Sequence, residues 1–200
     1  MNAPDKLPDL HSQTLHQALY QRLIGGARGG LNEVFVAQML ASHLAGKGAL
    51  PRYLGLDEVS FKKMLAWHFP RISPDVFSVE DREMPLRSGE LDDVRILLID
   101  HRLHRSPSEY WIATIIATGC MAPDHLWSDL GLFSRQFLTQ MMELNFPTLA
   151  ARNDKNMKWK KFLYKQLCAQ EGIYICRAPS CEECADYAVC FAEGEAKPVP

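Results

Sequence analysis

Four of the six cysteines of the chain lie close together near its C-terminal end, in the pattern Cys176-x4-Cys181-x2-Cys184-x5-Cys190. The first residues lack the basic and apolar segments of a secretory signal, so we expect a reducing, cytoplasmic environment in which disulfides are disfavoured. Crowded thiols in such an environment are typical of a metal site. The sequence therefore predicts that these four cysteines bind metal.

The spacing favours an iron–sulfur centre over zinc and leaves both open. Four-cysteine zinc sites generally use two separated C-x2-C turns, and only one, Cys181–Cys184, is present here. The first three cysteines match the C-x4-C-x2-C run of plant-type ferredoxins. A cluster is also wider than one ion, so irregular spacings within one loop suit it. An iron–sulfur cluster is the preferred interpretation, zinc the second, and a loop without metal the third.

Other candidate ligands are weaker. Cys168 is predicted near the lysine side of a helix, where it could face the cysteine loop, although an inert packed thiol is the preferred interpretation. Cys120 follows an isoleucine-rich segment and is predicted to lie in the core. His125 could be a ligand of a second site, as could the pair His101 and His104, but we favour structural roles for these histidines.

No other catalytic machinery is visible in the sequence. The glycine-rich segment 25–30 lacks the Lys and Ser/Thr of a phosphate-binding loop. No zinc-protease pair or nucleophile elbow occurs either. The sequence therefore contains no recognisable motif for hydrolytic or nucleotide-dependent catalysis, and we do not expect an enzyme.

A basic segment precedes the cysteines. Residues 152–165 contain six basic side chains and one acidic side chain, and helical geometry places three of the lysines on one face: Lys158, Lys161 and Lys165. A solvated outer face is the preferred interpretation. The alternative is an electropositive approach for an oxyanion or an acidic protein.

The overall composition is that of a soluble globular protein. The chain has 200 residues, 47% of them hydrophobic, and a formal net charge of -2. A net charge this close to zero does not provide the positive potential that attracts nucleic acid, so no nucleic-acid partner is expected. The most apolar continuous stretch, Tyr110 to Pro123, is shorter than the roughly 20 residues that span a bilayer, so no membrane partner is expected.

Hydrophobic periodicity predicts helices in the first half of the chain. Apolar residues recur at helical spacing in three stretches, and the proline-containing residues 71–89 are predicted to form a connector. The three sets are Leu15, Leu19, Leu23 and Ile24; Leu31, Val34, Phe35, Met39 and Leu40; and Phe61, Leu65 and Trp67.

The later helices carry boundary signals. Ser106-Pro107-Ser108-Glu109 predicts a capping box, with Ser106 as the N-cap and Glu109 as its reciprocal partner. Ser134 is predicted to cap the next helix, which Pro147 ends. The last helix is predicted from Asn153 or Asp154 to Gly172, with an apolar stripe of Trp159, Phe162, Leu163 and Leu167.

These elements predict an all-α protein: a compact helical domain with a C-terminal cysteine-rich metal-binding loop. No convincing strand pattern is present. We assign residues 1–172 to the helical domain, residues 173–191 to the cluster-binding loop and residues 192–200 to a disordered tail.

Three segments of the chain form a recognisable combination. The first comprises Met157 to Phe162 with Tyr164, followed by Cys176-Arg177-Ala178-Pro179-Ser180-Cys181 and then Cys184, Asp186, Tyr187, Cys190 and Phe191. The others are His125 to Leu132 and Phe146 to Ala151. Together they resemble the NifQ family of nitrogen-fixation molybdenum donors, and the resemblance is densest between residues 119 and 191.

The resemblance implies an iron–sulfur protein that carries molybdenum toward the iron–molybdenum cofactor of nitrogenase. The implied cofactors are a cluster of the 3Fe-4S or MoFe3S4 type and molybdenum, the latter taken from molybdate or another source. The implied partners are the cofactor-assembly scaffold and the nitrogenase iron protein. The residues alone also leave open a zinc-stapled interaction module and a small iron–sulfur electron carrier.

Overall fold

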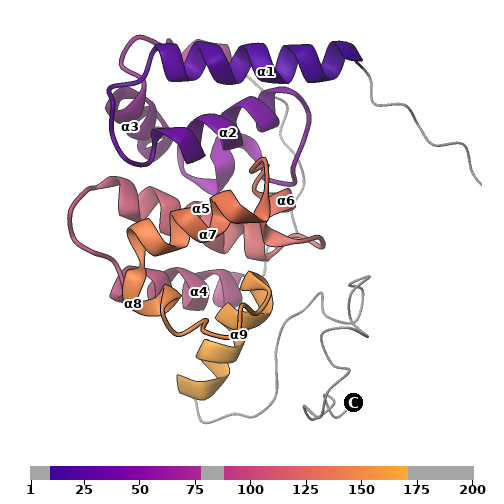
Figure 1. Cartoon of the computed structure of the whole chain (residues 1–200). Coiled ribbons are helices and arrows are strands. Elements are labelled where there is room, and N and C mark those ends of the chain that lie inside the picture. Colours follow the sequence, from indigo (N-terminus) through magenta and orange to yellow (C-terminus); the bar gives the residue numbers. More distant parts are fainter. Residues whose placement is uncertain (1–9, 78–87, 171–200) are drawn as a thin grey trace, which may run out of the picture.

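Two strongly apolar helices form the centre of the fold in the computed structural model, which describes residues 10–77 and 88–170. Helix α2 (Glu33–Leu44) buries every residue from Phe35 to His43, and α5 (Ser108–Cys120) buries most of its length. A helix that is apolar on nearly all sides is stable only when other elements cover it. The remaining helices accordingly pack around this pair (Figure 1).

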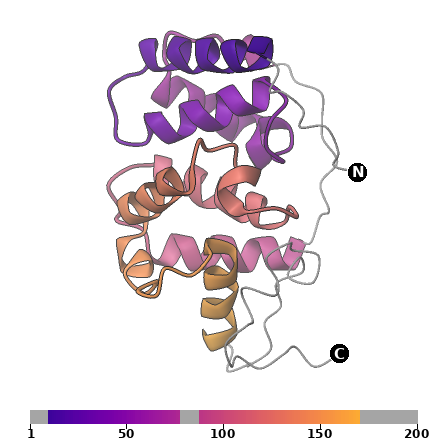
Figure 2. The ribbon, with the colours of Figure 1, turned by 45° about the vertical axis from the view of Figure 1, so that its right-hand side comes forward.

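The helices are stacked in layers (Figures 1 and 2). Helix α1 (Leu10–Gly25) covers α2, whereas α4 (Ser88–Asp100) packs against α5 and also contacts α9 (Trp159–Gln170). Helix α3 (Glu58–His68) and the 3-10 helix η1 (Arg52–Gly55) pack on α5, and a second 3-10 turn, η2, spans Pro74–Phe77.

The segment after α5 contains three shorter elements that complete the bundle. They are α6 (Leu126–Asp129), α7 (Arg135–Asn145) and α8 (Pro147–Ala150). The described residues contain no strand, so the predicted all-α class is confirmed for them. Across the same residues, no helix has both the length and the apolar character needed to cross a bilayer.

Both hydrogen bonds of the capping box predicted before α5 are present, although the helix begins one residue later than predicted, at Ser108, with Pro107 in the N-cap position. Ser106 Oγ accepts a hydrogen bond from the Ser108 N–H (3.1 Å), and the Glu109 carboxylate accepts one from the Ser106 N–H (3.2 Å). Two reciprocal bonds thereby satisfy amide groups that have no partner within the helix. Ser134 occupies the N-cap position of α7 as predicted, but its side chain makes no cap hydrogen bond.

The last helix begins later than predicted. It starts at Trp159, because the preceding residues form turns around Asn153. Asn153 Oδ1 accepts a hydrogen bond from the Met157 N–H (2.8 Å), and Asn153 Nδ2 donates one to the Met157 carbonyl (3.0 Å). Asn156 adopts a positive φ of 51°, which is incompatible with a continuous helix.

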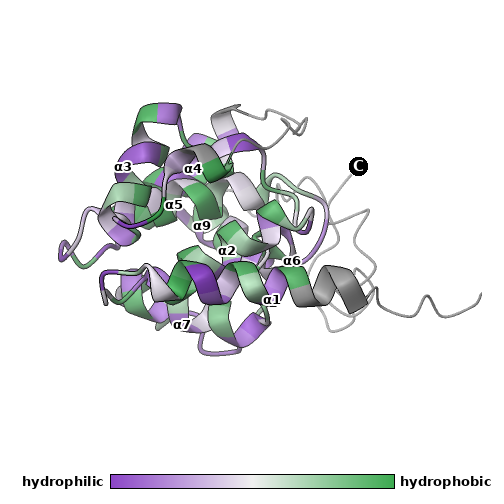
Figure 3. Cartoon of the chain, turned by 90° about the horizontal axis from the view of Figure 1, so that it is seen from above, coloured by the Kyte–Doolittle hydropathy of each residue, from purple (hydrophilic) through white to green (hydrophobic). Residues whose placement is uncertain are grey.

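Part of the predicted core lies at the surface. Leu31 is 71% exposed and Leu15 is 54% exposed, and Trp67 stacks under the guanidinium of Arg28 instead of entering the core. Periodicity identifies an apolar face but not whether another element covers it. Figure 3 shows this for α1, whose turns alternate between hydrophilic and hydrophobic although the helix covers α2.

A buried polar network links four helices or their ends. Asn32 Nδ2 donates to Asn145 Oδ1 (2.8 Å) and to Ser108 Oγ (3.1 Å), and His68 Nε2 lies 2.8 Å from the same hydroxyl. Burial lowers the pKa of His68 from 6.5 to about 4, and the nearby positive charge of Arg28 adds to this effect. His68 is therefore neutral at physiological pH, and the network joins the ends of α2, α3, α5 and α7.

Candidate metal-cluster site and its helical platform

Helix α9 is the described element that precedes the predicted metal site. It is described as far as Gln170, six residues before Cys176, so the predicted end at Gly172 lies outside the described residues. The four cysteines of the predicted site, Cys176, Cys181, Cys184 and Cys190, lie outside the described residues, as do the proposed loop and tail boundaries. Their role as ligands therefore stays a prediction, and the structure describes the platform from which this segment leaves.

The apolar side of α9 anchors the helix in the core. Trp159, Phe162, Leu163 and Tyr164 are buried, and Leu167 packs at the edge of the core. The Trp159 indole N–H donates to Thr139 Oγ1 of α7 (3.1 Å), and its ring meets Phe162 edge-on. The predicted stripe is thus confirmed, and burial of these large side chains fixes the rotation of α9 about its axis.

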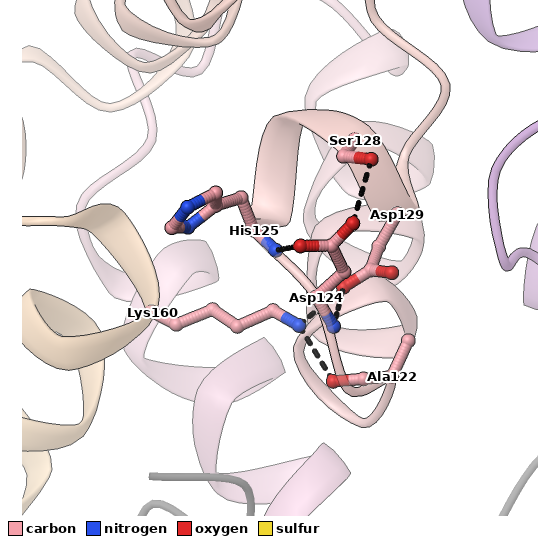
Figure 4. A network of polar contacts seen from close by, with 6 residues as sticks. All are labelled: Ala122, Asp124, His125, Ser128, Asp129 and Lys160. Atoms are coloured by element: carbon pink, nitrogen blue, oxygen red, sulfur yellow. Dashed lines mark hydrogen bonds and ion pairs between the residues drawn. The ribbon is translucent and has the colours of Figure 1, made fainter. Parts of the chain in front are cut away.

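A buried ion pair ties the first turn of α9 to α6 (Figure 4). Lys160 Nζ pairs with the carboxylate of Asp129 and donates a second hydrogen bond to the Ala122 carbonyl (2.6 Å). The side chain of Asp129 is 4% exposed and that of Lys160 is 12% exposed. Because both charges are largely removed from water, each depends on the other for compensation.

The turn before α6 holds the receiving carboxylate in place. Asp129 also accepts a hydrogen bond from the Asp124 N–H (3.1 Å). Asp124 in turn accepts bonds from the His125 N–H (2.7 Å) and from Ser128 Oγ (3.1 Å), as Figure 4 shows. Burial raises the pKa of Asp129, and the ammonium of Lys160 opposes that shift. The close ion pair therefore indicates that Lys160 keeps a buried carboxylate charged.

A second tether orients the turn that leads into α9. Arg135 Nη2 donates to the carbonyl and the side-chain oxygen of Asn156, both at 2.8 Å, and to the Met157 carbonyl at 3.1 Å. Arg135 is the first residue of α7. The turn before α9 and the first turn of the helix are consequently each bonded to another part of the domain.

The two described cysteines differ from one another. Cys120 is buried in α5, as predicted, and burial raises the pKa of its thiol to about 12. Cys120 is therefore protonated at physiological pH and cannot serve as a thiolate ligand. Cys168 is half-buried in the second half of α9, eight residues before Cys176. Its predicted position beside the cysteine loop is untested, because that loop lies outside the described residues.

The described histidines form no metal centre within the described residues, where no three His, Cys, Asp or Glu side chains converge on a common point. His125 is the N-cap residue of α6, and Figure 4 shows its imidazole on the side from which Lys160 enters. His101 and His104 follow the end of α4, and His104 has a positive φ of 58°. The helical spacing assumed for that pair is therefore wrong.

Sequence reasoning did not single out Lys160. It was counted as one of six cations of a solvated segment, whereas it is the partner of a buried carboxylate. The available signal was its position beside Trp159 and Phe162, since a residue next to a buried stripe lies at the boundary of the core. Of the other lysines of this segment, Lys155 and Lys165 are exposed and Lys158 and Lys161 are partly buried. Lys158, Lys161 and Lys165 each have an interaction partner.

The fold and this platform define a class: an all-α protein whose last described helix, anchored by buried aromatic residues and an ion pair, precedes a cysteine quartet. The family model NifQ matches residues 35–192. Protein NifQ of Azotobacter vinelandii is 43% identical over 171 residues, which cover 80% of this chain and 88% of that protein. Protein NifQ of Rhodobacter capsulatus is 35% identical over 158 residues, covering 78% and 86% respectively.

A third relative, the protein NifQ homolog of Sinorhizobium fredii, is 38% identical over 151 residues that cover 76% of this chain and 66% of that protein. No solved structure matches the chain. The chain belongs to the NifQ family, which assigns it a role in nitrogen fixation. The resemblance noted in the sequence is thereby confirmed, and the matched segment includes all four clustered cysteines.

Proposed function

We propose that the protein is a molybdenum carrier: it holds molybdenum in an iron–sulfur cluster on Cys176, Cys181, Cys184 and Cys190 and donates it during assembly of the nitrogenase iron–molybdenum cofactor. The observation that carries the proposal is the cysteine quartet inside the segment that matches the NifQ family. On this proposal the protein is a carrier and not an enzyme, and it works in the reducing cytoplasm.

The donor set suits such a cargo. Thiolates are soft ligands that favour iron–sulfur chemistry. A cuboidal three-iron cluster needs three thiolates, one for each iron, and its remaining corner offers sulfide donors to reduced molybdenum. The fourth thiolate is then available to complete that corner. The described thiols do not offer an alternative set, because Cys120 is buried and protonated and Cys168 is a single residue.

Delivery requires a partner that supplies its own ligands. Replacement of the cysteine thiolates by donors of the acceptor transfers the cluster without consuming electrons. We propose the cofactor-assembly scaffold and the nitrogenase iron protein as partners. Anchoring of α9 keeps the point at which the cysteine segment leaves the domain fixed while such an exchange takes place.

The decisive experiment is oxygen-free purification of the full chain, followed by quantification of iron, sulfide, molybdenum and zinc. We expect iron and sulfide in the wild type and incorporation of molybdenum when a source is supplied. Single substitutions of the quartet by Ala should lower the iron content, whereas Cys168→Ala serves as the matched control outside the quartet. Zinc at one ion per chain would instead indicate an interaction module. Reversible redox chemistry without molybdenum uptake would indicate an electron carrier.

The basic segment allows a second test of the proposal. The triple substitution of Lys158, Lys161 and Lys165 by Gln should slow molybdenum loading or transfer, because it removes positive charge from the segment before the quartet. The matched control replaces three exposed lysines elsewhere: Lys47, Lys62 and Lys63. Equal loading and transfer rates in the wild type, the triple variant and the control would reject a role for the basic segment. The assignment of the four cysteines as ligands would then be tested by the metal quantification alone.

A further inference from the structure

The loop between α4 and α5 forms a cation-rich cleft. The cleft has a volume of about 290 Å³. Its lining residues include three that carry or can carry positive charge and no carboxylate: Arg102, His104, Arg105, Ser106, Pro107 and Tyr110. All three cationic side chains follow the end of α4. His101 does not line the cleft, and its Nδ1 lies 2.8 Å from the Leu97 carbonyl.

A buried carboxylate holds the loop in shape. Glu109 is 3% exposed, and its oxygens accept hydrogen bonds from the backbone N–H groups of His104 (2.8 Å), Arg105 (2.8 Å) and Ser106 (3.2 Å). The Leu103 N–H donates to the last residue of α7 (3.2 Å), which adds a fourth anchor. The carboxylate of Glu109 is thus occupied by hydrogen bonds to the backbone beneath the cleft. These bonds hold the loop in its conformation without a ligand.

The two guanidinium groups have no acidic partner among the described residues. The Cζ atom of Arg102 lies 3.8 Å from the centroid of the Tyr110 ring. Neither Arg102 nor Arg105 forms an ion pair with a carboxylate of the described residues. Stacking on an aromatic ring restricts the orientation of a guanidinium while its edge donors stay available to oxygen ligands. Arg105 adds a second positive charge to the same cleft, so the site favours a negatively charged ligand.

We propose that this cleft binds a tetrahedral oxyanion of the phosphate, sulfate and molybdate type through Arg102 and Arg105, with His104 and the Ser106 hydroxyl at its rim. The planar donor fork of arginine matches two oxygens of such an anion, and charge-assisted bonds of this kind are the strongest that side chains offer. The N-terminus of α5 borders the cleft, and its dipole favours the same sign of charge. The proposal does not depend on the cysteine cluster.

The test is titration calorimetry of the full chain with sodium sulfate, phosphate and molybdate, at constant ionic strength and with chloride as the reference anion. We expect the tetrahedral anions to bind and the double variant R102Q/R105Q to bind them at least tenfold more weakly. The variant R22Q/R71Q makes the same change of charge at two exposed positions outside the cleft and should stay within twofold of the wild type.

The outcomes separate specific binding from general charge effects. Similar affinity for all three anions would support recognition of their shared tetrahedral shape and charge. Tighter binding of molybdate would also support the proposal and would indicate that molybdate enters the protein at this cleft. Absence of binding at millimolar concentrations, or equal weakening in both double variants, would overturn the proposal. If R102Q/R105Q fails to fold by circular dichroism, the amide NMR signals of His104 and Arg105 in the wild type must shift on addition of sulfate, and unshifted signals overturn it.

Discussion

Replacement of Lys160 by Met tests whether the buried ion pair anchors α9. Methionine keeps an unbranched apolar stem of similar length but removes the ammonium, so the carboxylate of Asp129 is left 4% exposed without its cationic partner. Removing one member of a buried pair generally costs about 3–5 kcal/mol, because the remaining charge is uncompensated. We expect K160M to lower the free energy of unfolding by about 3 kcal/mol, measured by urea denaturation with circular dichroism at pH 7.

The exposed pair of Lys62 and Glu58 provides the matched control. Its side chains are 55% and 54% exposed, although its atoms are as close as 2.6 Å. An exposed i,i+4 pair of this kind contributes about 0.3–0.5 kcal/mol. The variant K62M removes the same functional group and an ion pair of comparable length. The difference between K160M and K62M therefore isolates the effect of burial.

A double variant separates the loss of the pair from other effects of the substitution. The variant D129N/K160M carries neither charge, so it should be more stable than the sum of the two single effects predicts, by about 2 kcal/mol of coupling. If K160M is no less stable than K62M, or if the two single effects add, the buried pair does not anchor α9. In that case the buried aromatic stripe alone would hold α9 in place ahead of the cysteine segment.

Three further predictions concern the scaffold. Because the pKa of His68 is lowered to about 4, the unfolded chain takes up the proton first as pH falls below 6.5. Between pH 7 and pH 5, stability should therefore fall by about 2 kcal/mol more in the wild type than in H68Q, which keeps the pH dependence of other groups such as His16, whose pKa is also lowered by burial; parallel pH profiles would contradict this. The substitution Gly55→Ala should lower the free energy of unfolding by about 2 kcal/mol or more, because φ is +84° and the new Cβ would lie 2.3 Å from Thr118 Oγ1. The control Gly29→Ala also has a positive φ, +97°, but open space around the new Cβ, so it should lower that free energy by about 1 kcal/mol. The substitution Glu109→Gln should cost about 1–2 kcal/mol in urea denaturation, because it weakens bonds to three backbone N–H groups, and an unchanged midpoint would argue against that role.

Patterns among neighbouring residues were sufficient to predict many of the helices of the domain. The capping box at Ser106 depends on residues three positions apart, and the stripe of α9 depends on spacings of three and four, so both can be read from neighbouring residues. The start of α9 was misplaced because Asn153 bonds to Met157 in a turn that competes with the helix. Capping residues favour such turns and helix starts alike, so their presence alone does not decide between the two.

The pairing of Lys160 with Asp129 could not be derived in this way. The two residues are far apart in the sequence, and charged residues within a basic segment are usually solvated, so neither spacing nor composition identifies a buried partner. The exposure of Leu31 was missed for the same reason, since it depends on which element packs above it. Burial is a property of tertiary packing, whereas the patterns that predicted the helices are local.

The ion pair joins two separate stretches of the chain on which the resemblance to the NifQ family was based. The segment His125–Leu132 contributes Asp129, and the segment Met157–Phe162 contributes Lys160, so the two meet in one buried contact (Figure 4). Trp159 and Phe162, from the second stretch, lie in the core. These four residues of the two stretches are thus occupied by structural contacts within the described part of the chain. On the proposed function, the metal chemistry consequently rests on the cysteine quartet, and these two stretches serve it by fixing the helix from which the quartet follows.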